Sequence, residues 1–101
     1  MQIKLTNEQM IAIDNEEDLI VGGEEWEYVC ELDTEEDERG RYLTYIFKRP
    51  SDNKCFRITV AYARYAYEDY GYEEFMQDFT AYEVERKEIK KIEWVYVDWL
   101  K

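Results

Sequence analysis

The clearest alternation of hydrophobic and polar residues lies in residues 25–33. Every second residue there is apolar or aromatic, namely Trp26, Tyr28, Cys30 and Leu32. The positions between them are mostly acidic, namely Glu25, Glu27, Glu31 and Asp33, with Val29 among them. Because successive side chains of a strand point to opposite faces, this pattern predicts a half-buried antiparallel strand with one acidic face.

Two further segments, residues 41–49 and 54–63, are rich in β-branched and aromatic residues. The turn sequence Pro50-Ser51-Asp52-Asn53 separates them, with proline at a favoured turn position. Together they predict an antiparallel hairpin. Residues 80–100 are interpreted as extended, either one long strand or two strands with a bend, although their charged middle also suits a helix.

Two short segments are predicted to be helical. Thr6 and Gln9 have the spacing of a capping box, which predicts a helix over residues 7–13. Between residues 64 and 79 the aromatic residues follow neither a strand nor a helix period. One interpretation is a turn near Gly71 followed by a second short helix at residues 72–79.

These elements predict an α+β fold in a single domain, residues 1–101. The expected architecture is an antiparallel sheet of about four strands with a short N-terminal helix. No apolar run is long enough for a signal peptide or a membrane helix, which favours a cytoplasmic protein without membrane contact.

Charge is distributed unevenly along this domain. The net charge is −12, yet residues 1–38 hold 14 acidic residues and a single base, Lys4. Residues 39–101 hold 11 acids and 12 bases. Such an acidic region repels nucleic acid and anionic membranes and attracts basic protein surfaces.

The chain lacks the residues that several kinds of active site and metal site usually require. The chain has no histidine and no glycine-rich phosphate loop, which removes the commonest general base and most zinc sites. We therefore expect no enzyme, no metal and no cofactor. Cys30 and Cys55 suit a reducing compartment as small buried thiols, and they could touch if their strands are neighbours.

The candidate binding residues are acidic and aromatic. A rigid row of carboxylates could imitate nucleic-acid phosphates, and the alternative is that it only keeps the protein soluble and protects a sheet edge. The tyrosines could supply contact area, or half of them could be core. The candidates are Glu24, Glu25, Glu27, Glu31, Asp33, Glu35, Glu36, Asp37, Glu38, Tyr67, Tyr70 and Tyr72. Glu16, Glu17 and Asp18 could extend the row.

The segment YEVERKEIKKIEWVYV, residues 82–97, resembles small acidic proteins encoded by phages and prophages of Gram-positive bacteria. The predicted hairpin adds to the likeness, which covers about the last 60 residues. These proteins share no catalytic residues. The resemblance implies a protein that inhibits a host defence or replication protein by binding it, as anti-CRISPR proteins do when they fill the DNA groove of a Cas nuclease.

The leading hypothesis is therefore a non-catalytic phage inhibitor, monomeric or dimeric. It would bind a basic groove of a host protein, possibly a Cas nuclease, by imitating DNA and without contacting nucleic acid itself. One alternative is a homo-oligomer that sequesters a nucleotide signal, which requires Arg57, Arg64, Arg86 and Lys87 to converge. Another is a structural or assembly component of a phage particle.

Overall fold

The computed structural model describes residues 1–32, 34–66, 69–88 and 92–97. Within these ranges the chain forms one α-helix, nine strands and one 3-10 turn. In chain order they are β1 (Gln2–Lys4), α1 (Asn7–Asp14), β2 (Leu19–Val21), β3 (Glu24–Glu31), β4 (Glu35–Glu36), β5 (Gly40–Arg49), β6 (Lys54–Ala66), β7 (Asp69–Tyr72), η1 (Glu74–Met76), β8 (Thr80–Glu88) and β9 (Ile92–Tyr96).

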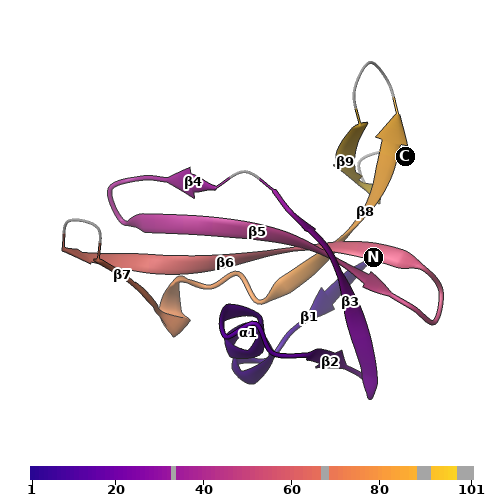
Figure 1. Cartoon of the computed structure of the whole chain (residues 1–101), viewed down its shortest axis with the longest axis horizontal. Helices are drawn as coiled ribbons and strands as arrows, with labels where there is room; N and C mark the ends of the chain where they lie inside the picture. The colour runs from indigo at the N-terminus through magenta and orange to yellow at the C-terminus, as the bar shows by residue number, and fades with distance from the viewer. Residues whose placement is uncertain (33, 67–68, 89–91, 98–101) are drawn as a thin grey trace.

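The strands form one antiparallel, curled sheet centred on the β5–β6 hairpin (Figure 1). The main strand order is β1-β8-β6-β5-β3-β2. β4 adds to β5, β7 adds to β6, and β9 adds to β8. The predicted hairpin is therefore present, and residues 80–100 contain two strands within their described part.

The prediction of an α+β fold with about four strands is wrong, because the described residues form a nine-stranded sheet with one α-helix. β1, β2, β4 and β7 contain only two to four residues each. Strands this short are held by backbone hydrogen bonds to a longer neighbour and show no period in the sequence.

The second predicted helix, at residues 72–79, is also wrong. Tyr72 ends β7, only Glu74–Met76 form a single 3-10 turn, and the backbone is extended again at Gln77. Of its aromatic residues, Tyr72 and Phe79 pack against the core, whereas Phe75 is 83% exposed.

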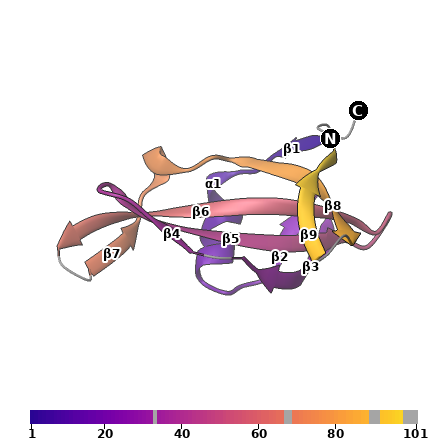
Figure 2. The same ribbon diagram turned by 90° about the horizontal axis from the view of Figure 1, so that it is seen from above.

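The helix α1 begins as the sequence predicts. Thr6 Oγ1 accepts a hydrogen bond from the Gln9 backbone N–H at 3.1 Å, and Gln9 Oε1 accepts one from the Thr6 N–H at 2.7 Å. The other end of the Gln9 amide donates to the Ile20 carbonyl at 2.8 Å, which ties α1 to β2. The two views place α1 against the middle of the β5–β6 hairpin (Figures 1 and 2).

The core lies between α1 and one face of the sheet. Met10 and Ile13 of α1 pack against Phe56, Ile58 and Val60, which alternate along β6 and are fully buried. Trp26 of β3 stacks on Phe56 with 4.7 Å between ring centroids. Aromatic and β-branched side chains thus fill the space between helix and sheet.

Cys30 and Cys55 lie on the face of the sheet opposite α1. Cys30 is opposite Ile46 and Cys55 is opposite Lys48, so β5 separates the two cysteines. Two strand spacings amount to about 9.6 Å, which exceeds the Cα separation that a disulfide allows. Both thiols are free, and the possibility that their strands are direct neighbours is not realised.

Gln77 takes the place of a strand beside β6. Its side-chain oxygen accepts from the Ala61 N–H at 2.8 Å, and its amide nitrogen donates to the Ala61 carbonyl at 2.7 Å. The same nitrogen also donates to the Glu73 carbonyl at 2.8 Å. One side chain thus satisfies the edge of β6 between the segments paired with β7 and β8.

We expect Gln77→Leu to lower the free energy of unfolding by about 2 kcal/mol, because it leaves the part-buried N–H and carbonyl of Ala61 without partners. Urea denaturation measures this change. Gln77→Glu should be destabilised nearly as much, since a carboxylate accepts from the N–H but cannot donate to the carbonyls. Unchanged stability in both variants would refute the strand-like role of Gln77.

An acidic hollow beside β3

A hollow of about 650 Å³ lies between β3 and the loop that follows α1. Half of its lining residues are acidic: Glu16, Glu17, Asp18, Glu25, Glu27 and Glu31. The other half are apolar or aromatic: Ile13, Leu19, Trp26, Tyr28, Tyr45 and Phe47. We call this feature the acidic hollow. Its lining includes no lysine or arginine among the described residues.

Local backbone geometry brings the two acidic segments of the hollow together. Glu16 has a φ of 59°, a left-handed conformation that ends α1 and turns the chain toward β2. Gly22 and Gly23, with φ of 61° and 77°, form the two-residue turn between β2 and β3. Positive φ at both positions is what a type I′ hairpin turn requires.

The register of β2 on β3 then decides which acids meet. Leu19 lies opposite Trp26, so Asp18 comes beside Glu27 at the end of the paired region. Acids separated by nine residues in the sequence therefore line the same hollow. The hairpin turn, and not the alternation along β3, creates this concentration of charge.

Tyr28 is an exposed aromatic residue that lines the hollow. Its side chain is 59% exposed, although the ring makes edge contacts with Tyr45 at 6.4 Å and Phe47 at 6.0 Å. Burial and the Glu31 carboxylate raise the pKa of Tyr45. Burial and a hydrogen bond to Asp14 likewise raise the pKa of Tyr62, whose side chain interacts with that of Tyr45. Burial is the larger cause in both cases, so these two tyrosines belong mainly to the packed aromatic layer.

The predicted single acidic face of β3 is broken by a β-bulge. Glu27 lies opposite Lys48 and Glu31 lies opposite Tyr45, and the register shifts between Tyr28 and Cys30. Lys48 and Tyr45 are three residues apart on β5, so their side chains leave opposite faces of the sheet. Glu27 and Glu31 therefore belong to different faces and meet only around the edge of β3, in the acidic hollow.

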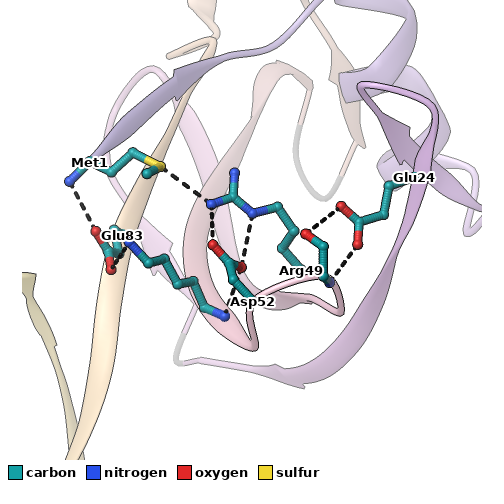
Figure 3. Close-up of polar contacts among 7 residues, drawn as sticks. Met1, Glu24, Arg49, Asp52 and Glu83 are labelled. Carbon is teal, nitrogen blue, oxygen red and sulfur yellow. Dashed lines mark hydrogen bonds and ion pairs between the residues drawn. The ribbon is translucent and has the colours of Figure 1, made fainter.

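Glu24 has a structural role. Its carboxylate accepts hydrogen bonds from the Ser51 backbone N–H at 2.6 Å and from the Ser51 hydroxyl at 3.0 Å (Figure 3). In the same turn the Arg49 guanidinium pairs with Asp52 at 2.6 Å and lowers the pKa of that carboxyl to about 2. Glu24 thus anchors the β5–β6 turn to the start of β3.

The acids of residues 35–38 lie apart from the hollow, where β4 pairs with the opposite half of β5 (Figure 1). Glu36 forms an ion pair with Arg41 at 2.9 Å. Asp37 accepts from the backbone N–H groups of Arg39 at 2.8 Å and Gly40 at 3.1 Å. Glu35 and Glu38 are exposed and make no hydrogen bond or ion pair among the described residues. The predicted row is therefore divided into two patches.

Tyr70 and Tyr72 are half-buried. A role as contact surface would have them exposed. The Arg41 guanidinium lies 4.2 Å from the centre of the Tyr70 ring. The Tyr72 hydroxyl donates to Asn7 Oδ1 at 2.6 Å and joins β7 to the start of α1. Two other candidates, Asp33 and Tyr67, lie outside the described residues.

From the sequence, the three acids Glu16, Glu17 and Asp18 are only a possible extension of the row, and neither Tyr28 nor Tyr45 is among the candidates. The signal that could have identified them is the glycine pair between two acidic segments. Such a pair predicts a tight hairpin, and a tight hairpin brings its flanking residues together. No sequence pattern, in contrast, predicts the bulge.

The nucleotide-binding alternative requires basic residues to converge. Arg57 and Arg64 are both on β6, but seven residues separate them, so they leave opposite faces of the sheet. Arg57 instead lies near the Tyr96 ring, at 5.7 Å from its centre. These two arginines therefore do not form an anion pocket together.

Comparison with known protein families, with curated proteins and with solved structures finds no match to this chain. Within the described ranges no helix is long and apolar enough to span a membrane. In the same ranges no three acidic or cysteine side chains are arranged to hold a metal ion.

Two neighbouring acids, Glu24 and Glu25, test whether one is structural while the other contributes only to the acidic hollow. We expect Glu24→Ala to lower the free energy of unfolding by about 1 kcal/mol, because the Ser51 turn loses its acceptor. Glu25→Ala should change it by less than about 0.5 kcal/mol, since Glu25 makes no hydrogen bond or ion pair among the described residues. Urea denaturation of both variants measures the two changes in the free energy of unfolding. Equal effects would contradict the assignment.

The Asp37 carboxyl should titrate below its ordinary value of 3.8, because the Arg39 and Gly40 N–H groups lower its pKa. A lowered pKa stabilises the loop above pH 3.8, and this stabilisation is lost as the pH falls through the folded-state value. Carboxyl-carbon NMR measures the midpoint. In the urea-unfolded chain the midpoint should return to the ordinary value, and a folded midpoint at or above 3.8 would be inconsistent with these two hydrogen bonds.

Proposed function

We propose that this protein is a non-catalytic inhibitor that binds a basic, nucleic-acid-binding groove of another protein and competes with the nucleic acid. The observation that supports this most is the acidic hollow, where six carboxylates converge without a basic lining residue. Lys48 offsets one of them, through its ion pair with Glu27 at 3.2 Å. The remaining charge is available to a cationic surface.

The spacing of the carboxylates suits a groove built for phosphates. Glu25 and Glu27 are two residues apart on a strand, or about 6.6 Å. Phosphates also follow one another at regular intervals, and nucleic-acid-binding proteins hold them with lysine and arginine. Pairing with β2 and β5 fixes the backbone at Glu25, Glu27 and Glu31, so the partner would have to order only their side chains on binding.

The second acidic patch adds to this interaction. Glu35 and Glu38 are exposed on the other half of the sheet, close to the β4–β5 turn. A groove long enough to hold a nucleic-acid strand could contact both patches at once. Tyr70 would contribute only the part of its ring that Arg41 leaves open.

The resemblance of residues 82–97 to small phage and prophage proteins supports a specific setting for this proposal. In it, the protein is phage-encoded and acts in the bacterial cytoplasm. Its partner is a host defence protein, with a Cas nuclease as the first candidate. The carboxylates would occupy the DNA channel, and the chain would bind no nucleic acid directly.

Displacement of labelled DNA from a purified Cas nuclease tests the proposal. We expect displacement at low salt that weakens as salt rises, because salt screens exposed charges. Glu25→Lys with Glu31→Lys should weaken it roughly tenfold, at about 0.2–1 kcal/mol per lost ion pair plus new repulsion.

The matched control is Glu8→Lys with Glu85→Lys, which changes the net charge equally at exposed sites outside the hollow. It should displace DNA nearly as well as the unmodified protein. Displacement that ignores salt, or that both double variants weaken equally, would argue against a defined acidic contact. No displacement from any basic nucleic-acid-binding protein would refute the proposal.

A further inference from the structure

We infer that a second hollow, at the end of the sheet where β5 begins and β6 ends, binds an acidic peptide segment of a protein partner that carries one aromatic side chain (Figure 1). This hollow measures about 570 Å³, and its lining includes Arg39, Arg64, Ala63, Phe75 and Met76. We call it the basic hollow. The inference goes beyond the proposed function, because it concerns residues outside the acidic hollow.

The two arginines of the basic hollow are neighbours without an ionic partner. The Arg64 backbone N–H donates to the Arg39 carbonyl at 3.0 Å, so the two residues lie side by side. Both are exposed, and neither guanidinium forms an ion pair, a hydrogen bond or a ring contact among the described residues. The Arg39 charge is only the smallest of the influences that lower the pKa of Asp37. Like charges on adjacent strand residues repel each other, so an anion bound between the two arginines would relieve this repulsion.

Elsewhere in this chain the group that an arginine binds is a carboxylate. Arg41 pairs with Glu36 at 2.9 Å, and Arg49 pairs with Asp52 at 2.6 Å. Glu38 also lines the basic hollow, but it forms no ion pair with the arginines there. Both guanidiniums are therefore available to a carboxylate of another molecule, which accepts their parallel N–H groups.

Phe75 indicates independently that the occupant has an apolar part. Its side chain is 83% exposed, the largest fraction among the large hydrophobic residues that the structure describes. Hydrogen bonds hold the turn that carries it: the Met76 N–H donates to the Glu73 carbonyl at 3.1 Å, and the Gln77 side chain joins that carbonyl to the edge of β6. The ring is thus kept outside the core, where an apolar group of a partner can remove it from water.

A nucleic-acid strand fits the basic hollow less well than a peptide. The strand β4 and the turn after it carry four consecutive acids, residues 35–38, directly before Arg39. Phosphates recur along every nucleic-acid strand, so some of them would come next to these acids. A peptide can place carboxylates only at the arginines and neutral or basic residues opposite the acids. The mixed charge of this surface therefore favours a peptide.

The blocked peptide Ala-Glu-Phe-Glu-Ala is the probe, with Ala-Gln-Phe-Gln-Ala, Ala-Glu-Ala-Glu-Ala and a thymidine hexanucleotide for comparison. Amide and arginine side-chain NMR spectra measure binding in about 0.15 M salt, which screens exposed acids more than about 8 Å away. We expect the first peptide to shift the Phe75 amide and the side-chain signals of Arg39 and Arg64. The glutamine peptide should bind at least about threefold more weakly, and the peptide without phenylalanine at least about fivefold more weakly.

Two charge-matched double variants locate the site. Arg39→Gln with Arg64→Gln should weaken binding of the first peptide about fivefold or more, because both guanidiniums are lost. Lys4→Gln with Arg86→Gln changes the net charge equally at exposed residues outside the basic hollow, and it should change binding by less than about twofold. Phe75→Ser should also weaken binding about fivefold and leave the urea midpoint unchanged, since so exposed a ring adds little to stability.

Several outcomes would overturn the acidic-peptide site. They are equal weakening by the two double variants, unchanged binding to Phe75→Ser, equal affinity for the glutamine peptide, and tighter binding of the hexanucleotide. Absence of any shift in the basic hollow with the first peptide would overturn it as well. None of these results bears on the displacement of DNA, which depends on the acidic hollow.

Discussion

The contact between Trp26 and Phe56 is the interaction on which the acidic hollow depends. Trp26 is opposite Leu19 on β2, and its ring stacks on Phe56 of the central hairpin. It therefore holds the β2–β3 hairpin to the core while the flanking acids remain in solvent. A smaller core residue in place of Trp26 would weaken the packing of this hairpin against β6, although the backbone pairing of β3 with β2 and β5 would remain.

This arrangement has an electrostatic cost. Like charges in one hollow repel each other, and the repulsion destabilises the folded state. Solubility needs only net charge, which could be spread over the surface. Protection of the β3 edge from pairing needs only a few charges and a bulge, both of which β3 has. Neither requirement explains why acids from the α1–β2 loop also line the hollow around an exposed tyrosine.

The parts of the fold that sequence could predict are those with a local physical cause. The capping box at Thr6 and the proline turn after β5 depend on residues within a few positions of one another. The β3 bulge and the two-residue strand β4 depend on where β5 lies, which no local pattern records. For the same reason Glu24 and Tyr72 were taken for contact residues. Their hydrogen-bond partners, Ser51 and Asn7, are 27 and 65 residues away.

The bulge changes what kind of surface β3 can be. Without it, the acids of β3 would form a flat row on one face, and any regular array of cations could match them. With it, Glu31 turns to the face that carries Tyr28, and Glu27 stays with Lys48 on the other. The surface becomes a concave site with an aromatic wall and a limited volume. A site of that kind restricts what can bind by its shape as well as by its charge.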